Sequence, residues 1–201
     1  MKKQTTLLVT IIVLAALFIG SFLVVNWYLQ GQKTTTPPKD SAATDSGTLL
    51  EFVGVKKIEV DKVFGSPQKA SYLDFYIVIF EPLTGDSRLD SSQIQLIPTS
   101  FLAVNSSCIT LNELCKEALK KKFIGESGAQ IISERNLTVA GRPAYEFEAN
   151  FTKDGEEQKQ KVVNIDGEIR DLQVSFLAYS DVYDQFINSV DEAVNSLELS
   201  I

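Results

Sequence analysis

The sequence predicts an α+β fold: an antiparallel β-sheet (meander) with helices packed on it, preceded by one transmembrane helix and a linker. Three observations support this prediction. A long uncharged stretch lies near the N-terminus, strand-like runs separated by glycine-bearing turns fill the C-terminal half, and the last residues repeat apolar side chains at helical spacing. Strands that follow one another directly favour an antiparallel sheet over a parallel α/β arrangement.

Residues 1–30 form the predicted anchor. Two lysines precede an uncharged stretch, residues 4–32, whose apolar core at residues 5–28 would span about 36 Å as a helix at about 1.5 Å per residue. This length crosses a hydrocarbon core of about 30 Å. A long signal sequence is the alternative, but its apolar part is usually about 7–15 residues, and Trp27 and Tyr28 suit a membrane interface. We expect an uncleaved transmembrane anchor.

The orientation of this anchor follows from its flanking lysines. Lys2 and Lys3 lie directly beside the apolar run, whereas Lys33 and Lys39 follow at a greater distance. Because positive residues near a membrane span favour the cytoplasmic side, we expect a cytoplasmic N-terminus. The prediction is a single-pass protein of the cell membrane whose C-terminal domain is extracytoplasmic.

Residues 31–48 are the predicted flexible linker, because they contain no large apolar side chain that could offset the entropy of ordering. Residues 49–201 have a normal size for one domain. The whole chain carries a net charge of −7, and residues 1–48 hold four Lys and two Asp, which leaves −9 for the domain. Such an acidic domain repels phosphate backbones, so we expect no nucleic acid partner.

The C-terminal half of the domain is predicted to be a meander of four strands, at residues 129–139, 142–153, 157–165 and 168–179. Asp154-Gly155 and Asp166-Gly167 supply the positive φ angles of tight hairpin turns. Gly141 lets the chain turn before Pro143, which sits where a strand begins and its missing N–H costs least. Further strand-like runs come earlier in the domain, at residues 49–65, 71–82 and 92–101.

Alternation in the second run of the meander sorts its side chains onto two faces: Ala144, Glu146 and Glu148 on one, Tyr145, Phe147 and Ala149 on the other. We expect the first face to be wet and the second to be packed in the core.

Two helices complete the predicted domain. The last begins at Ser180, a predicted N-cap, and its apolar residues recur every three or four positions as far as Leu197, so this stripe should lie on the sheet. The other begins at Thr110, where a capping box reaches Glu113, and ends near Phe123. It is predicted to turn four apolar side chains inward: Leu111, Leu114, Ala118 and Leu119.

The composition excludes most classes of enzyme mechanism. The chain contains no histidine, so it lacks the usual general base near neutral pH and the commonest transition-metal ligand. No glycine-rich phosphate loop is present, and the acidic hairpin turns lack the alternating ligands of a calcium loop. We therefore predict no enzyme, no catalytic residue, no metal and no cofactor.

Two sets of residues remain as candidate sites. Glu146 and Glu148 share one strand face with roughly 7 Å between them, and with Arg142 they are the candidate binding residues; a solvated sheet face explains them equally. Cys108 and Cys115 are the only cysteines and a candidate disulfide, with buried free thiols as the alternative, because the chain before the helix would have to fold back for their Cα atoms to come within about 7 Å.

The order of several segments resembles the PsbP-like family, which has the Mog/PsbP-type fold. The segments are "FYIVIFEPLTGDS", "TLNELCKEALKK", the meander from "VAGRPAYEFEA" to "LQVSFLAY", and the closing "YDQFINSVDEAVNSLEL". Ten residues stand at matching places: Gly141, Pro143, Ala144, Tyr145, Glu146, Gly167, Tyr183, Asp184, Ser196 and Leu197. The resemblance covers roughly residues 71–199. The opening segment "VFGSPQKASYLDF" departs from the family pattern.

The resemblance implies a non-enzymatic module that docks on a partner, since the family includes extrinsic photosystem subunits. With the predicted anchor, it makes the chain a membrane-anchored domain that binds a protein or assists a complex. The alternative that the sequence leaves open is a domain that binds or senses a small ligand or a divalent cation. An enzyme using the Glu146 and Glu148 carboxylates is the third hypothesis.

Overall fold

The structure is a computed structural model that describes residues 46–72, 75–100, 108, 110–167 and 171–200, all within one compact unit, Thr44–Ile201. The predicted anchor at residues 1–30 and most of the predicted linker lie outside the described residues. Within those ranges, no helix combines the length and the apolar character needed to cross a membrane.

The described elements follow one another as α2 (Ser46–Phe52), β1 (Val55–Lys57), β2 (Gln68–Tyr72), β3 (Phe75–Phe80), β4 (Gln93–Thr99), α4 (Glu113–Ser127), β5 (Gln130–Val139), β6 (Arg142–Lys153), β7 (Glu156–Ile165), β8 (Asp171–Tyr179), α5 (Ser180–Asn195) and β9 (Glu198–Leu199). Seven strands form one sheet in the order β2-β3-β4-β8-β7-β6-β5, and every neighbouring pair is antiparallel. The short strands β1 and β9 pair separately. The predicted α+β class with a four-stranded meander is confirmed.

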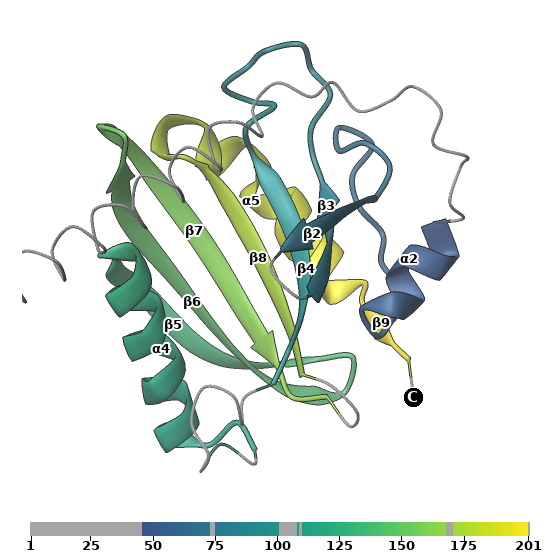
Figure 1. The fold of residues 1–201 in the computed structure, drawn as a ribbon, viewed down its shortest axis with the longest axis vertical. Helices are drawn as coiled ribbons and strands as arrows, with labels where there is room; N and C mark the ends of the chain where they lie inside the picture. Colours follow the sequence, from purple (N-terminus) through teal and green to yellow (C-terminus); the bar gives the residue numbers. More distant parts are fainter. Residues whose placement is uncertain (1–45, 73–74, 101–107, 109, 168–170, 201) are drawn as a thin grey trace, which may run out of the picture. The chain divides into compact units, whose positions relative to one another are not determined.

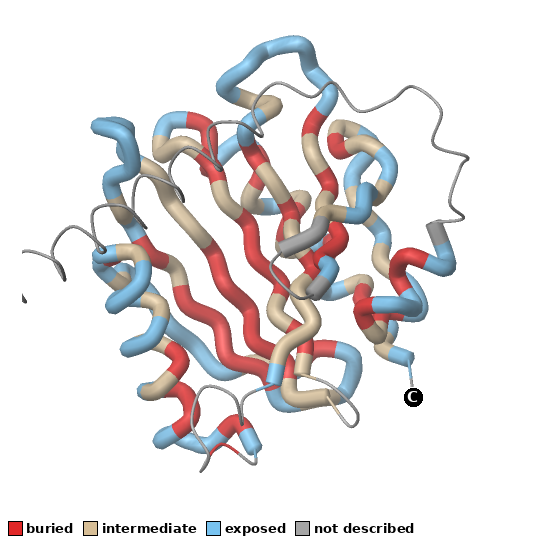
Figure 2. The backbone as a smooth tube through the Cα atoms, viewed as in Figure 1, coloured by how far each residue is buried: buried red, intermediate tan, exposed pale blue. Residues whose placement is uncertain are grey.

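Helices cover both faces of the sheet: α4 lies on one face and α5 on the other (Figure 1). Tyr145 and Phe147 pack with Leu119 of α4, whereas Ala144 packs with the apolar stripe of α5. The prediction of one wet face is therefore wrong, because α5 and its stripe occupy the face that Glu146 shares. Burial is concentrated on the central strands of the sheet (Figure 2).

The turns of the meander are only partly as predicted. Gly141 has φ 76° and follows Ala140 at φ 51°, so a two-residue turn of type I′ joins β5 to β6. Asp154 and Gly155 make the next tight turn, with φ 55° and 83°. The tight turn predicted at Asp166-Gly167 is wrong, because Ile165 pairs with Leu172 across a longer loop. There the Asp166 N–H donates to the Pro143 carbonyl instead.

The N-caps of both helices differ from the predicted ones by one or two residues. Asn112, not Thr110, caps α4: its side-chain oxygen accepts a hydrogen bond from the Cys115 N–H at 3.0 Å. This helix ends at Ser127, beyond the predicted end. Tyr179, not Ser180, occupies the N-cap of α5, with no side-chain hydrogen bond.

The N-terminal part of the domain also differs from the sequence prediction. Helix α2 starts at Ser46, inside the predicted linker, and includes residues 49–52, which were predicted as strand. Only β1 fits that prediction. Leu49, Leu50 and Val53 are buried in the core, so the segment gains its order from packing. The predicted strand at residues 71–82 is the hairpin of β2 and β3.

Candidate functional site

The three predicted binding residues lie in two separate places. Arg142 begins β6, while Glu146 lies four residues further along the strand, roughly 13 Å away at about 3.3 Å per residue. Glu146 is only 5% exposed and Glu148 is half-buried. The structure therefore brings Glu146 and Glu148 together on one face, as predicted, but does not bring Arg142 to them.

Glu146 belongs to a buried ionic cluster that joins three strands and α5. Lys161 of β7, 3% exposed at its side chain, places its Nζ 3.2 Å from Glu146 Oε2, 2.5 Å from Asp191 Oδ1 and 3.9 Å from Glu148 Oε1. Arg135 of β5 stands opposite Glu146, and its Nε lies 2.7 Å from Glu146 Oε1. The hydrogen bond to Glu146 raises the pKa of the Arg135 guanidinium.

This cluster is built to hold elements together. Each carboxylate faces at least one cation, and the two buried side chains, Lys161 at 3% exposure and Glu146 at 6%, compensate each other where water is excluded. Tyr183 of α5 lies beside it, and burial, followed by the nearby Glu148 carboxylate, raises the pKa of its hydroxyl. Within the described ranges, no three His, Cys, Asp or Glu side chains gather in an arrangement that could hold a metal ion. The arrangement fixes β6 against β5, β7 and α5.

Arg142 instead lines a cavity of about 860 Å³ between the β5–β6 turn, α2 and the C-terminal strand β9. The cavity has apolar walls that include Phe52 and Leu199, and charged groups of both signs at Lys56 and Glu198. Those two charges pair at 3.5 Å on the surface. A cavity of this size is in the range of small-molecule sites.

Cys108 and Cys115 belong to one apolar cluster that α4 forms with the sheet, and they are 2% and 0% exposed. Both are free thiols in the structure. Burial, followed by the neighbouring Cys108, raises the pKa of the Cys115 thiol to about 12. A thiol with such a pKa is a poor nucleophile at neutral pH. The disulfide between the two stays a prediction.

A groove of about 980 Å³ lies between the outer side of α4 and the edge strand β5, and we call it the α4–β5 groove. Three exposed large apolar side chains line it: Leu114 at 70% exposure, Ile132 at 46% and Ile124 at 41%. They are half of the six large apolar residues that are exposed in the described part of the chain. Apolar side chains gathered in this way mark interaction surfaces more often than scattered ones do.

In the described part of the chain, the outer side of β5 is an open sheet edge. Among the described strands, β5 pairs only with β6 and ends the seven-stranded sheet. The type I′ turn makes Val139 and Arg142 a hydrogen-bonded pair, and such pairs alternate along an antiparallel ladder. Thr138 and Pro143 then form a non-hydrogen-bonded pair, which agrees with the absence of a backbone N–H in proline. The backbone N–H and C=O groups of Glu134, Asn136 and Thr138 therefore point away from the sheet.

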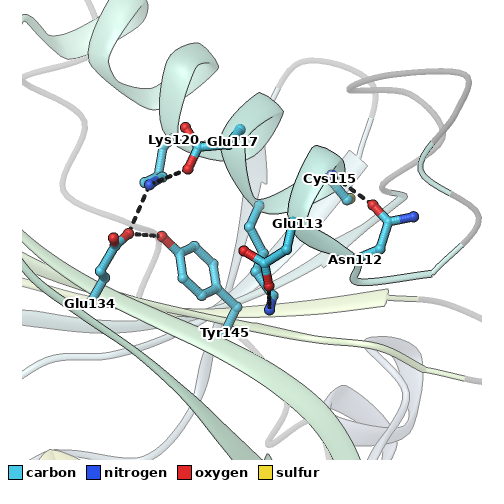
Figure 3. Close-up of polar contacts among 8 residues, drawn as sticks. Asn112, Glu113, Cys115, Glu117, Lys120, Glu134 and Tyr145 are labelled. Carbon is cyan, nitrogen blue, oxygen red and sulfur yellow. Dashed lines mark hydrogen bonds and ion pairs between the residues drawn. The ribbon is translucent and has the colours of Figure 1, made fainter.

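A polar clasp fastens α4 over this edge (Figure 3). The Lys120 ammonium of α4 lies 2.8 Å from Glu134 Oε2 on β5 and 2.6 Å from Glu117 Oε1, and the Tyr145 hydroxyl donates to Glu134. The hydrogen bond from Lys120, followed by that from Tyr145, lowers the pKa of Glu134. Burial and the Glu134 contact raise the pKa of the Tyr145 hydroxyl. The clasp joins α4 to β5 and β6.

The sequence prediction missed this site because it turned Leu114 inward. The buried apolar residues of this segment are Leu111, Cys115 and Leu119, four residues apart, and this phase leaves Leu114 outside. Counting Cys115 as an apolar residue would have selected the correct phase, since buried free cysteine behaves as a small hydrophobic side chain. The open strand edge has no comparable local signal.

Comparisons with known proteins give distant structural similarities only. A scan of the sequence against protein-family models finds no match, and a search of the curated proteins finds no significant relative. The solution structure of cyanobacterial PsbP (CyanoP) from Synechocystis sp. PCC 6803 is 12% identical with a TM-score of 0.49, over 81% of this chain and 99% of that one.

Two further solved structures are similar to the same extent. LpqN, which is involved in cell envelope biogenesis of Mycobacterium tuberculosis, is 13% identical with a TM-score of 0.49, over 72% of this chain and 83% of that one. A protein of unknown function from Pseudomonas aeruginosa is 10% identical with a TM-score of 0.48, over 66% and 96%. At these identities and TM-scores the similarities assign neither a family nor a function to this chain.

Proposed function

We propose that this chain is a membrane-anchored, non-enzymatic, extracytoplasmic PsbP-like domain that binds a protein or assists a protein complex. The observation that carries the binding role is the α4–β5 groove, where exposed apolar side chains stand beside an open strand edge. The PsbP-like part of the proposal rests on the motif order in the sequence.

A protein partner fits this surface better than a small solute does. An open strand edge offers backbone donors and acceptors in a row, which a second polypeptide strand satisfies in register. The adjoining apolar side chains of Leu114, Ile124 and Ile132 supply the buried area that main-chain hydrogen bonds alone do not give. Two lysines and two glutamates also line the groove, so it is neutral within an acidic domain.

The membrane part of the proposal is supported by the uncharged stretch at residues 4–32 and the lysines before it. It is tested by fractionation of the full chain. We expect the chain in membranes that have been washed at alkaline pH, and a variant that lacks residues 1–30 in the soluble fraction. If an untagged variant that lacks residues 1–30 stays with the membranes, residues 1–30 are not the anchor and this part of the proposal is wrong. Protease access from outside the cell tests the orientation.

The binding role is tested by photo-crosslinking from the groove. A benzophenone amino acid replaces Leu114 in one variant of the full chain and Leu83 in the control. Leu83 has a matching exposure of 73% but lies in the β3–β4 loop, away from the groove. We expect a discrete protein adduct from position 114 in intact membranes and none from position 83. Equal labelling from both positions, or none from either, would contradict the proposal.

A second candidate function is supported by the cavity that Arg142 lines. Its volume of about 860 Å³ and its mixed apolar and charged walls suit a small amphipathic ligand. A thermal-shift screen of small carboxylates and nucleosides against the domain, with Arg142→Ala as the control, tests this alternative. A ligand that raises the melting temperature of the wild-type domain but not of the variant would favour it.

A further inference from the structure

We propose that the partner at the α4–β5 groove is a second copy of this chain, joined to the first by antiparallel pairing of the two β5 strands about a two-fold axis at Asn136. This inference rests on the proposed function, because it takes the groove to be a protein-binding surface. It adds the identity of the partner and the register of the contact.

The register follows from the shape of β5. An irregularity in the pairing between Ile131 and Ser133 interrupts the ladder near the start of the strand, so the regular part runs from Ser133 to Val139. A two-fold axis between antiparallel strands stands perpendicular to the sheet and places one residue opposite its own copy. Asn136 is the midpoint of the regular part, and its backbone groups point outward. Pairing there uses the whole regular segment.

Charge selects the same register. An axis at Glu134 would set two carboxylates directly opposite each other, which is destabilising. An axis at Thr138 would leave only the end of the strand to pair. With the axis at Asn136, Glu134 of one copy faces Thr138 of the other, and Arg135 faces Leu137. Asn136 faces its own copy, where the two side-chain amides can donate to and accept from each other.

One symmetric partner would cover both parts of the surface, the open edge of β5 and the exposed apolar side chains of α4. Rotation about an axis perpendicular to the sheet keeps each face on its own side, so the two α4 helices lie on the same face beside the joined edges. The exposed Leu114 and Ile124 of each copy then approach the edge of the other. A partner that offers only a strand would leave these helical side chains uncovered.

The charge distribution allows two copies to meet here. The domain carries a net charge of −9, so copies repel each other over most of their surface. The groove is lined by Lys120 and Lys121 and by Glu117 and Glu134, a balanced set that can meet its own copy without net repulsion. Salt should therefore strengthen the contact, since it screens the general repulsion more than the apolar burial.

The test is disulfide trapping in the full chain, kept in native membranes. Asn136→Cys places two thiols at the axis, where Cα atoms of a directly opposed pair lie about 5.5 Å apart, within the range that a disulfide bridges. Thr138→Cys is the matched control on the same exposed strand face. In the proposed register its two copies are four residues apart, roughly 13 Å, too far for a disulfide. The native cysteines are buried.

Under mild oxidation by a copper(II) phenanthroline complex, we expect Asn136→Cys to shift from 22.2 kDa to twice that mass on a non-reducing gel. Thr138→Cys and the unmodified chain should remain at 22.2 kDa. Mixing copies that carry Glu134→Cys with copies that carry Thr138→Cys should give a mixed dimer, because these positions face each other.

Three results would overturn the inference. The contact is excluded if Asn136→Cys stays at the mass of one chain in the membranes, while circular dichroism of the purified variant shows that it is folded. Equal trapping of Asn136→Cys and Thr138→Cys indicates random collisions. Trapping of Asn136→Cys with a different protein alone removes the second copy but leaves the proposed binding function standing, whereas the absence of any adduct from Leu114 removes that function as well.

Discussion

Replacing Lys161 by Met tests whether the ionic cluster around Glu146 stabilises the fold. Met keeps the apolar stem but removes the charge that lies 3.2 Å from Glu146 and 2.5 Å from Asp191. Breaking a buried ion pair by removing one partner costs roughly 3–5 kcal/mol. Glu146 keeps its contact with Arg135, and the Asp191 side chain is 38% exposed and can be hydrated. We therefore expect a loss of about 3 kcal/mol, the lower end of that range.

The assay is urea unfolding of residues 44–201, followed by far-ultraviolet circular dichroism, with the free energy of unfolding extrapolated to water. Lys159→Met is the control, because Lys159 lies on the same strand but is 27% exposed at its side chain and 3.8 Å from Asp184. It should lose about 1 kcal/mol or less. If Lys161→Met costs no more than Lys159→Met, the cluster is a solvated surface network and the structural interpretation fails.

Three further predictions concern α4 and its contacts. Leu119→Ala should cost about 2–5 kcal/mol of unfolding free energy and Leu114→Ala less than about 0.5 kcal/mol, because their exposures are 8% and 70%; urea unfolding compares them. The Cys115 thiol, with a pKa of about 12, should resist iodoacetamide at neutral pH in the native chain and react after unfolding, as mass spectrometry of alkylated peptides will show. The pKa of Glu134 lies below its ordinary value of 4.5 because Lys120 hydrogen-bonds to it, so this contribution to stability is present above pH 4.5 and is lost as the pH falls through the lower folded pKa. As the pH falls from 4.5 to the folded pKa of Glu134, the Glu134→Gln variant should therefore lose less stability than the wild type. Urea unfolding midpoints measured across this pH range test the prediction.

Local signals were enough to predict the meander. Alternation along residues 142–153, the Asp154-Gly155 turn and the glycine at position 141 each act within a few residues of the chain, and the strands β5 to β8 form where these signals place them. The apolar stripe of α5 is equally local, and Phe186 and Val190 are buried as the spacing predicts.

The burial of the charged residues could not be predicted from these local sequence signals. Glu146 alternates with Phe147 in the pattern of a wet sheet face. Its burial depends on Lys161, which stands next to it only through the pairing of β6 with β7, and on Asp191, which arrives with α5. Contacts between residues that are 15 to 45 positions apart leave no periodic trace.

The α4–β5 groove could not be predicted from the sequence for a related reason. Whether β5 is an edge or an inner strand depends on the sheet order, and the chain enters β5 from a helix rather than from another strand. The exposure of Leu114 depends on a choice between two helical phases that differ by one residue. Both features appear only when α4 is placed over the strand.

The claim that the α4–β5 groove is covered by a protein is tested most directly by thiol accessibility in cells. Leu114→Cys and Leu83→Cys are compared, because the two native side chains have similar exposures of 70% and 73%. A membrane-impermeant maleimide should label both positions equally in the purified, dilute domain. In intact cells we expect position 83 to stay reactive and position 114 to be protected. Equal labelling of the two positions in cells would contradict a covered groove.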